Sequence, residues 1–186
     1  MTVTGPKGFR AAGIACGIKP SGDPDLALVT TIDGKAVPAA AVFTSNLATA
    51  APVQVSRAHL AATQGRAAAV VLSSGNANAA TGERGKADAE RMCALAADGL
   101  GCEPEHVLVC STGLIGFYLP MAALESGVPA AVTQLAADGG PSAAEAIRTT
   151  DTHAKQTLVN GNGFAVGGIA KGAAMLAPNM ATMLAV

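Results

Sequence analysis

Short apolar segments separated by turn residues dominate the first part of the chain. Their Ala, Val and Ile content, bounded by Gly, Pro, Asp and Asn, is typical of strands. The spacing then changes to that of a helix. A continuous apolar run follows it, which is typical of a buried strand. The pattern predicts strands over 8–19, 25–32, 39–46 and 67–75, with a helix over 52–63 between the last two.

A longer helical pattern opens the second part of the chain. Over residues 83–99, Ala89, Met92 and Ala96 fall on one face, and the charged residues between them point away from it. An apolar stretch that ends in a turn follows at 106–113. We therefore expect a half-buried helix that leads into another strand.

The last part of the chain mixes helix and strand signals. Residues 119–135 and 142–148 have helical spacing, and Asp-Gly-Gly at 138–140 separates them. Pro129 has no backbone N–H to donate, so it should break or kink the first of these helices. Residues 164–177 have β composition but many glycines, which are typical of bulges or of close backbone approach.

The composition indicates one domain with an uncovered surface. The chain has no internal repeat, low-complexity tract or linker, so residues 1–186 are predicted to form a single α/β unit. Apolar residues make up 50% of it and charged residues only 13%, against a usual share of roughly 25%. A lone domain this poor in charge would expose much apolar surface, so we expect another chain to cover part of it.

Charge and hydropathy exclude several classes of function. The formal net charge is −1 without a basic cluster, which excludes nucleic acid and anionic membranes as partners. Residues 1–20 lack the apolar core of a signal peptide, and no apolar stretch approaches the roughly 20 residues that cross a bilayer, so we expect a cytoplasmic protein. The cysteines show neither CxxC nor metal-ligand spacing with histidine, so we expect buried thiols and no metal; they are Cys16, Cys93, Cys102 and Cys110.

Four turns rich in small polar residues follow apolar segments and are candidates for a site. They are SSGNANAATG (73–82), CSTGLIG (110–116), TTDTHAK (149–155) and KGAAMLAPNMATM (171–183). Ligands of α/β folds gather where strand ends release glycines and hydroxyl residues into loops. Each of them could also be an ordinary turn, because Asn, Gly, Ser and Thr are common in turns.

Familiar motifs for phosphate binding and for serine catalysis do not fit these turns. Lys171 stands between Ala and Gly and is not followed by Ser or Thr, as a Walker lysine would be. Val166 occupies a position where a dinucleotide fingerprint needs Gly or Ala. A Ser-His-Asp triad has weak support, since even His153 is more simply a loop residue.

Threonine chemistry suits the apolar end of the chain. Thr182 follows the small Ala181 in the run APNMATMLAV (177–186). A threonine becomes a nucleophile when its own α-amino group, with a reference pKa of about 7.7–8.0, is free to act as the base. Cleavage before Thr182 would free that group, and the run would then be a core strand continued in a partner segment. On these residues alone, an ordinary core threonine remains the simpler interpretation.

Taken together, the four turns resemble the ornithine acetyltransferase family, also called glutamate N-acetyltransferase. The resemblance extends in order and spacing from GFRAAGIACGIK (8–19) to MATML (180–184). It implies a layered α/β sandwich and a precursor of about twice this length that cuts itself into α and β chains. The β chain would be a partner from the same precursor, and the αβ units would assemble into a higher oligomer such as a heterotetramer.

The resemblance also implies roles for individual residues. Cleavage would fall between Ala181 and Thr182, which would make Thr182 the N-terminal nucleophile of the β chain. Thr112 and Gly113 match an oxyanion hole built from a hydroxyl and a backbone N–H, the kind of donor pair that stabilises a tetrahedral intermediate.

Two further positions match substrate contacts of that family. They are Thr149 and Lys171, and a lysine suits a substrate that carries a carboxylate. Its charge would also hold down the pKa of a nearby amine.

The implied reaction is a ping-pong acetyl transfer without a cofactor. Thr182 would take acetyl from N-acetylornithine, release ornithine and pass acetyl to glutamate, and acetyl-CoA is a possible second donor. An amidase or aminopeptidase with water as the acceptor is an alternative, and so is a non-catalytic subunit that docks a partner. The chain alone should be inactive, because the remaining substrate contacts of the family lie in the β half.

Two departures from the family pattern stand in this sequence. The chain continues past the expected scissile bond to Val186, so the bond is uncut, or the sequence is a shortened piece, or cleavage falls after Val186. In the last case the residue after Val186 would be the nucleophile and Thr182 a core residue. Ser73 replaces the usual Asn of an NSGNANA turn, which is a mild change.

Overall fold

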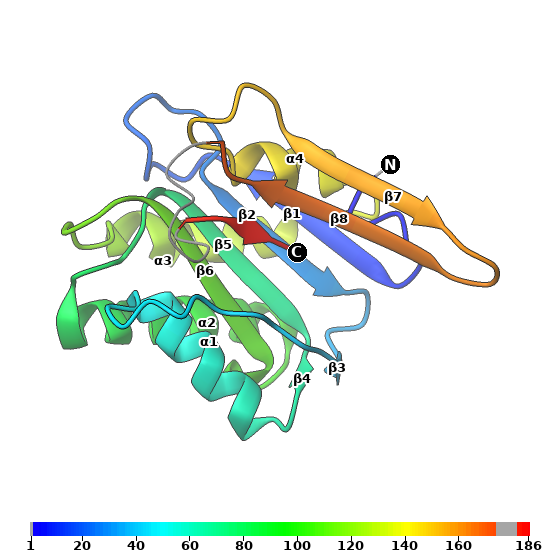
Figure 1. Ribbon diagram of the computed structural model, residues 1–186, viewed down its shortest axis with the longest axis horizontal. Helices are drawn as coiled ribbons and strands as arrows, with labels where there is room; N and C mark the ends of the chain where they lie inside the picture. Colours follow the sequence, from blue (N-terminus) through cyan, green and yellow to red (C-terminus); the bar gives the residue numbers. More distant parts are fainter. Residues whose placement is uncertain (1, 174–181) are drawn as a thin grey trace.

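A computed structural model describes residues 2–173 and 182–186 of the chain (Figure 1). Its helices are α1 (Ala51–Ala62), α2 (Gly82–Leu100), α3 (Met121–Thr133) and α4 (Gly140–Ala146), with a 3₁₀ turn at Pro104–His106. Its strands are β1 (Phe9–Ile14), β2 (Leu26–Thr31), β3 (Val37–Pro38), β4 (Arg66–Ala67), β5 (Ala69–Asn76), β6 (Val107–Leu114), β7 (Lys155–Asn160), β8 (Ala165–Lys171) and β9 (Leu184–Ala185).

The centre of the molecule is a four-stranded sheet in the order β1-β2-β5-β6. Strand β2 is buried along its whole length, because both faces of this sheet are covered. Its side chains alternate with the period of two that a strand imposes. Leu26 and Leu28 enter one apolar cluster, whereas Ala27 and Val29 enter the other.

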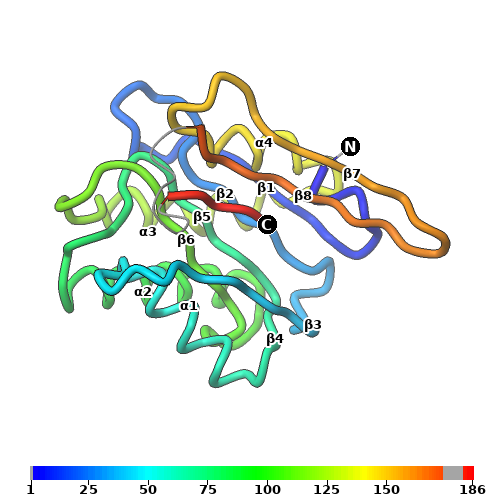
Figure 2. Tube along the Cα trace, viewed as in Figure 1, coloured from blue at the N-terminus to red at the C-terminus, as the bar shows by residue number. Residues whose placement is uncertain are grey.

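The two clusters define the layers on either side of the sheet. The first lies under α1, α2 and α3 and holds Met92, Leu124 and Val128. The second lies under α4 and the β7-β8-β9 sheet and holds Ile147 and Ile169. Figure 2 follows the chain through this arrangement, with the β7-β8 hairpin on the side of the sheet opposite to α1 and α2. The layered α/β sandwich is therefore confirmed.

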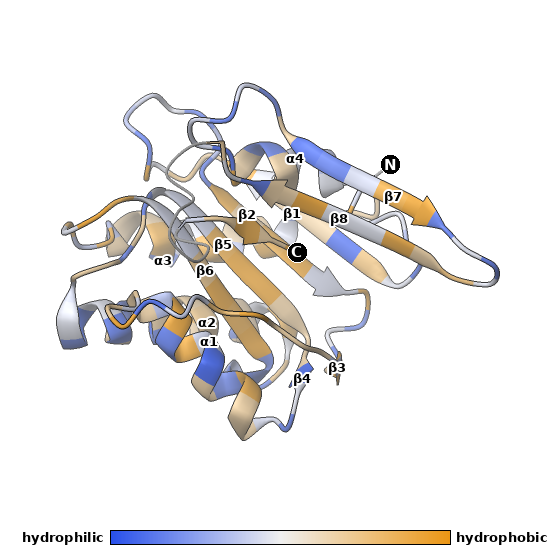
Figure 3. Ribbon diagram, in the orientation of Figure 1, coloured by the Kyte–Doolittle hydropathy of each residue, from blue (hydrophilic) through white to orange (hydrophobic). Residues whose placement is uncertain are grey.

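Strands β5 and β6 form the one parallel pair between the strands that the structure describes. Helix α2 connects them as a crossover, so their carboxyl ends meet at the same edge of the sheet. Both strands are strongly apolar in their first halves (Figure 3). At the shared edge the sequence turns to small residues, and Gly75 lies opposite Gly113.

Most predicted elements are confirmed, but the strand expected over 39–46 is wrong. This segment forms no strand, and Val42 is 84% exposed. The sheet has two edges: β1 pairs with Ala136 through Ala11, and side chains of α1 bind the backbone of β6 through Ser56 and His59. An apolar stretch without a sheet edge to join cannot complete a ladder.

The proline expected to interrupt a helix does not end it. Pro129 lies inside α3, which continues to Thr133. Its side chain is exposed, so the ring packs into no neighbouring layer.

The thiols are less uniformly buried than expected. Cys93 is buried, whereas Cys16, Cys102 and Cys110 are half-buried.

The last residues form a short strand in the β7-β8-β9 sheet. Strand β9 pairs with β8, with Lys171 opposite Leu184 and Ala170 opposite Ala185. Leu184 is half-buried and contacts the second apolar cluster. The described part of the apolar ending, residues 182–186, thus contacts the core through Leu184 and Val186, although Ala185 is exposed.

Candidate active site

Thr112 and Gly113 lie at the carboxyl end of β6, where the small residues of β5 and β6 meet. Thr112 is only 1% exposed. Gly113 has a φ of +134°, and a Cβ at this position would lie 2.3 Å from the carbonyl carbon of Gly75. Only glycine fits where the two paired strands approach each other so closely.

Lys171 brings three distant segments together at the end of β8. Its side chain is buried, and its Nζ donates to Thr112 Oγ1 at 3.1 Å. The same Nζ lies 3.5 Å from the carbonyl oxygen of Thr182, at the outer limit of a hydrogen bond. The residues predicted as oxyanion donor, substrate contact and nucleophile therefore share one cluster.

Thr182 lies two residues before the start of β9 and is half-buried. Ala181, the other side of the expected scissile bond, lies outside the described residues. The carbonyl group of Thr182 faces the Lys171 ammonium, so the backbone on the carboxyl side of the expected bond is held beside Thr112.

Asp151 supports this cluster from the segment between α4 and β7. It is 4% exposed, and its Oδ1 accepts from the backbone N–H of Gly172 at 2.8 Å and from Lys155 Nζ. Burial alone would raise the pKa of this carboxyl group. The hydrogen bonds from Lys155 and Gly172, with the charges of Lys155 and Lys171, outweigh burial and lower the pKa to about 2.

The charges around Lys171 act on it in opposite directions. Burial lowers the pKa of its ammonium group below the usual value, and the nearby Lys155 lowers it further. The carboxylate of Asp151 opposes both and favours the charged form. Asp151 is thus the group that compensates a buried cation.

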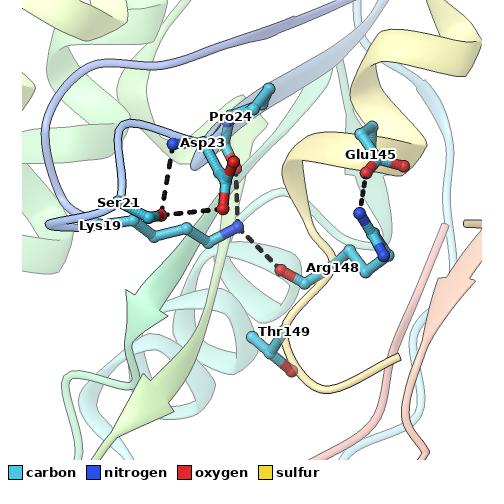
Figure 4. A pocket seen from close by; sticks show the side chains of 7 residues that line it. All are labelled: Lys19, Ser21, Asp23, Pro24, Glu145, Arg148 and Thr149. Carbon is cyan, nitrogen blue, oxygen red and sulfur yellow. Dashed lines mark hydrogen bonds and ion pairs between the residues drawn. The ribbon is translucent and has the colours of Figure 1, made fainter. Parts of the chain in front are cut away.

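Thr149 lies in a neighbouring pocket of about 360 Å³ rather than in contact with this cluster (Figure 4). The pocket is polar and carries charges of both signs. Its lining residues are Lys19, Ser21, Asp23, Pro24, Glu145, Arg148 and Thr149. A zwitterionic ligand such as an amino acid would suit this mixture of charges.

Lys19 ties this pocket to the strand ends. Its Nζ donates to the carbonyl oxygens of Pro24 at 2.7 Å and Arg148 at 2.8 Å, as Figure 4 shows. A Cβ at Gly75 would lie 3.0 Å from Lys19 Cγ, so the stem of Lys19 packs on the end of β5. The pocket therefore borders the edge at which Gly113 lies.

A buried carboxylate shapes the loop that carries Lys19. Asp25 is fully buried and accepts hydrogen bonds from four consecutive backbone N–H groups, at 2.6–3.1 Å. Those groups belong to residues 16–19. Such a set of donors compensates the burial of a carboxylate and holds the loop in one conformation.

Other candidate chemistries find little support among the described residues. His153 lies exposed in a loop beside Thr152, as expected, and forms no triad there. Residues 2–173 and 182–186 contain no group of three His, Cys, Asp or Glu side chains placed to hold a metal ion. In the same part of the chain, no helix is long and apolar enough to cross a membrane.

A comparison with known protein families matches residues 10–186 to the ArgJ family. The chain belongs to the ArgJ family. Its close relatives include two named "Arginine biosynthesis bifunctional protein ArgJ". The protein of Thermobifida fusca is 53% identical over 186 residues, and that of Streptomyces coelicolor is 55% identical over 186 residues. In both cases all of this chain matches, but it spans only 48% of the relative's length.

Solved structures of ArgJ-family proteins have the same fold. The ornithine acetyltransferase of Mycobacterium tuberculosis complexed with ornithine gives a TM-score of 0.91 at 46% identity, covering 98% of this chain and 96% of that chain. The arginine biosynthesis bifunctional protein ArgJ of Bacillus halodurans gives 0.85 at 38% identity, covering 99% and 95%. The family resemblance inferred from the four turns is confirmed.

Sequence reasoning missed three charged residues in and beside the candidate site. Asp151 stands inside the turn TTDTHAK, so a search for buried charge within the candidate turns could have found it. Lys19 and Asp25 gave no such signal, because their partners are backbone groups. Backbone partners leave no pattern of side chains in a sequence.

Proposed function

We propose that this chain is the N-terminal portion of an enzyme that transfers acetyl from N-acetylornithine to glutamate through an acetyl group on Thr182. The observation that carries the proposal is the position of Lys171 Nζ between Thr112 Oγ1 and the Thr182 carbonyl oxygen. It brings a hydroxyl donor, a cation and the expected nucleophile into one cluster. The Mycobacterium tuberculosis ornithine acetyltransferase with ornithine bound, at 46% identity, supports the substrate class.

The first step would free the nucleophile. The Thr182 hydroxyl oxygen attacks the carbonyl carbon of Ala181, the peptide C–N bond breaks, and an ester and a free α-amino group form. Water then opens the ester, which leaves a carboxylate on Ala181 and restores the hydroxyl of Thr182. The α-amino group, with a reference pKa of about 7.7–8.0, becomes the base for the later reaction.

The second step would be the acetyl transfer itself. The α-amino group takes the hydroxyl proton of Thr182 as its oxygen attacks the acetyl carbonyl carbon of N-acetylornithine. The C–N bond breaks and ornithine leaves with that proton. The amine of glutamate attacks the acetyl ester, so that N-acetylglutamate leaves and Thr182 regains its proton. Thr112 and the Gly113 backbone N–H would stabilise the oxyanion of both tetrahedral intermediates.

Lys171 and Thr149 would hold the substrate. An ammonium group has three N–H donors, and the contacts with Thr112 and Thr182 use two of them. The third is available for a substrate carboxylate. Thr149 would act from the adjoining pocket, whose charges of both signs suit an amino acid.

The activity would require the part of the protein that follows this chain. The chain spans about half the length of its relatives, and large apolar side chains are exposed at the end of β6 and directly after it. Leu114, Ile115, Phe117 and Tyr118 are all more than half exposed. Such a patch beside the site is suited to cover by another polypeptide segment, which we propose is the β chain.

The mass of each polypeptide in the purified full-length protein tests the cleavage. We expect a second chain that begins at Thr182, identified by N-terminal sequencing. A second chain that begins after Val186 would move the nucleophile out of the chain described here. Thr182→Ala should leave the precursor uncut and abolish acetyl transfer, whereas Thr133→Ala, in the exposed end of α3, should change neither.

Acceptor assays separate the proposal from its alternatives. With N-acetylornithine as the donor, added glutamate should yield N-acetylglutamate at a rate well above the release of acetate. Release of acetate alone would indicate an amidase. A docking subunit would give a different result. The unaltered protein would then catalyse no reaction, and Thr182→Ala would still bind the partner chain.

A further inference from the structure

Asp151 is a buried charge to which the proposed reaction assigns no step. Its carboxylate is 4% exposed and holds the backbone N–H of Gly172, the residue that follows Lys171. Gly172 has a φ of +146°, so the chain makes an unusual turn directly after Lys171. The second oxygen, Oδ2, is buried without a hydrogen-bond partner among the described residues. An unpaired buried carboxylate oxygen is costly, which argues for a role beyond packing.

The direction of the hydrogen bond between Lys171 and Thr112 matters for an oxyanion hole. A charged ammonium group can only donate, so Thr112 Oγ1 must be the acceptor in this 3.1 Å contact. The hydrogen of the Thr112 hydroxyl then points away from Lys171 and can be donated to an oxyanion. Accepting from a cation also polarises the hydroxyl and makes it a stronger donor.

A neutral amine at Lys171 would reverse this arrangement. Loss of a proton gives Nζ a lone pair, and Thr112 could then donate its hydrogen to Lys171 instead. The oxyanion hole would lose one of its two donors. The charge of Lys171 therefore decides whether Thr112 can act.

We propose that Asp151 is a positioning residue of the oxyanion hole, acting through Lys171. It holds the Lys171–Gly172 corner by its bond to the Gly172 N–H and stabilises the Lys171 ammonium, which in turn directs the Thr112 hydroxyl outward. This role rests on the proposed acetyl transfer, because it assigns Thr112 to the oxyanion of that reaction.

Two charged groups among the described residues act on Lys171, and they come from neighbouring segments. Asp151 precedes β7 and Lys155 begins it, and the two form an ion pair. Removal of Asp151 should lower the pKa of Lys171, and removal of Lys155 should raise it. Substitutions at these two positions should therefore shift the pH dependence of the reaction in opposite directions.

The pH dependence of kcat for the full-length protein tests whether the two substitutions shift the profile in opposite directions. The rate should fall as pH rises through the pKa of Lys171. In Asp151→Asn, which keeps an acceptor for Gly172, this fall should move to lower pH, because the carboxylate that favours the charged form of Lys171 is gone. In Lys155→Met it should move to higher pH. The exposed Asp138→Asn is the matched control and should leave the profile unchanged.

At neutral pH, kcat of Asp151→Asn should fall about ten-fold with a smaller change in KM. This is less than the roughly 10²–10³-fold cost of losing an oxyanion donor outright. The mass of each variant is measured first, to establish whether it has been cleaved. For a variant that is still uncut after purification, the rate of self-cleavage is measured in place of kcat. Profiles that shift in the same direction for Asp151→Asn and Lys155→Met would overturn the proposal.

A double-mutant cycle tests whether Asp151 acts through Thr112. Thr112→Val removes the hydroxyl, so Asp151→Asn should then have little additional effect on kcat. Full additivity of the two substitutions would contradict the coupling and assign Asp151 a merely structural role.

A titration separates this proposal from the proposed function. Nuclear magnetic resonance of the full-length protein with ¹³C-labelled lysine reports the pKa of Lys171 without any turnover, and Lys171→Arg assigns its signal. Asp151→Asn should lower this pKa, and if that variant does not fold, Lys155→Met should raise it. An unchanged value would overturn the proposal even in an active enzyme. A shifted value in a protein that transfers no acetyl would contradict the proposed function alone.

Discussion

At the residue scale, the site depends on two glycines that let strands β5 and β6 approach each other. Gly75 and Gly113 lie opposite each other, and both have positive φ angles. The missing side chains allow the carboxyl ends of these paired strands to approach closely without a clash. Thr112, the residue before Gly113, lies at this end of β6 and accepts a hydrogen bond from Lys171.

Gly113→Ala should therefore destabilise the protein and impair the site together. A Cβ at this position would lie 2.3 Å from the carbonyl carbon of Gly75, and its φ of +134° is strained for any L residue. We expect the free energy of unfolding to fall by at least roughly 2 kcal/mol, as measured by urea denaturation.

The control for this change is Gly116→Ala. Gly116 also has a positive φ, of +86°, but among the described residues no heavy atom would lie within 4 Å of a Cβ at this position. It should lose only about 1–2 kcal/mol from backbone strain. Equal losses at the two glycines would mean that close strand approach does not explain Gly113.

At the element scale, helix α1 takes the place of a missing strand at the edge of the central sheet. Ser56 Oγ donates to the Val109 carbonyl oxygen at 2.7 Å and accepts from the Val109 N–H at 2.8 Å. His59 Nδ1 lies 2.8 Å from the carbonyl oxygen of Val107. Side chains of one helix thus satisfy backbone groups of β6 that a fifth strand would otherwise pair.

Ser56→Ala should show how much this edge contributes. Ser56 is buried, so the substitution would leave both backbone groups of Val109 without these partners. We expect a loss of about 2–4 kcal/mol in the free energy of unfolding. Ser126→Ala, on the exposed side of α3, should change it by no more than about 0.5 kcal/mol. A loss at Ser56 as small as that at Ser126 would contradict the edge role.

At the scale of the whole molecule, Asp151 ties the segment between α4 and β7 to the sheet formed by β7, β8 and β9. It binds Gly172 after β8 and pairs with Lys155 at the start of β7. Its pKa is about 2 in the folded protein, below the reference value of about 3.9 for an unfolded chain. Folding therefore favours the ionised form of this group.

This shift predicts a specific acid sensitivity. Because the folded pKa lies below the unfolded one, the stabilisation is complete above about pH 4 and is lost as pH falls through about 2. Its size is on the order of 2–3 kcal/mol, because one pKa unit corresponds to about 1.4 kcal/mol. The free energy of unfolding is measured between about pH 5 and about pH 2, a range that includes both pKa values. It should fall less steeply with falling pH in Asp151→Asn than in the unaltered protein. An identical decline in both proteins would exclude this contribution, and Asp138→Asn serves as the control.

Several elements could be predicted from the sequence because their signals are local. The helix around Met92 has a clear period, and the strand around Leu28 begins with four apolar residues and lies between turns. The predicted strand over 39–46 failed because strand formation needs a partner edge, which composition does not reveal. Strand β7 was missed for the converse reason, since its residues are mostly exposed and its partner β8 decides its conformation.

The sequence by itself determined the α/β class, the family and the residue types at the ends of the strands. These follow from short-range periods, from turn residues and from four turns whose order and spacing can be read along the chain. Only the tertiary structure decided that Lys171 meets Thr112, which lies 59 residues earlier, and that Asp151 stands behind it. Such contacts depend on how the layers pack, and so do burial and the pKa shifts that burial causes. A linear pattern contains the residues of the site, whereas packing determines which of them share a low-dielectric environment.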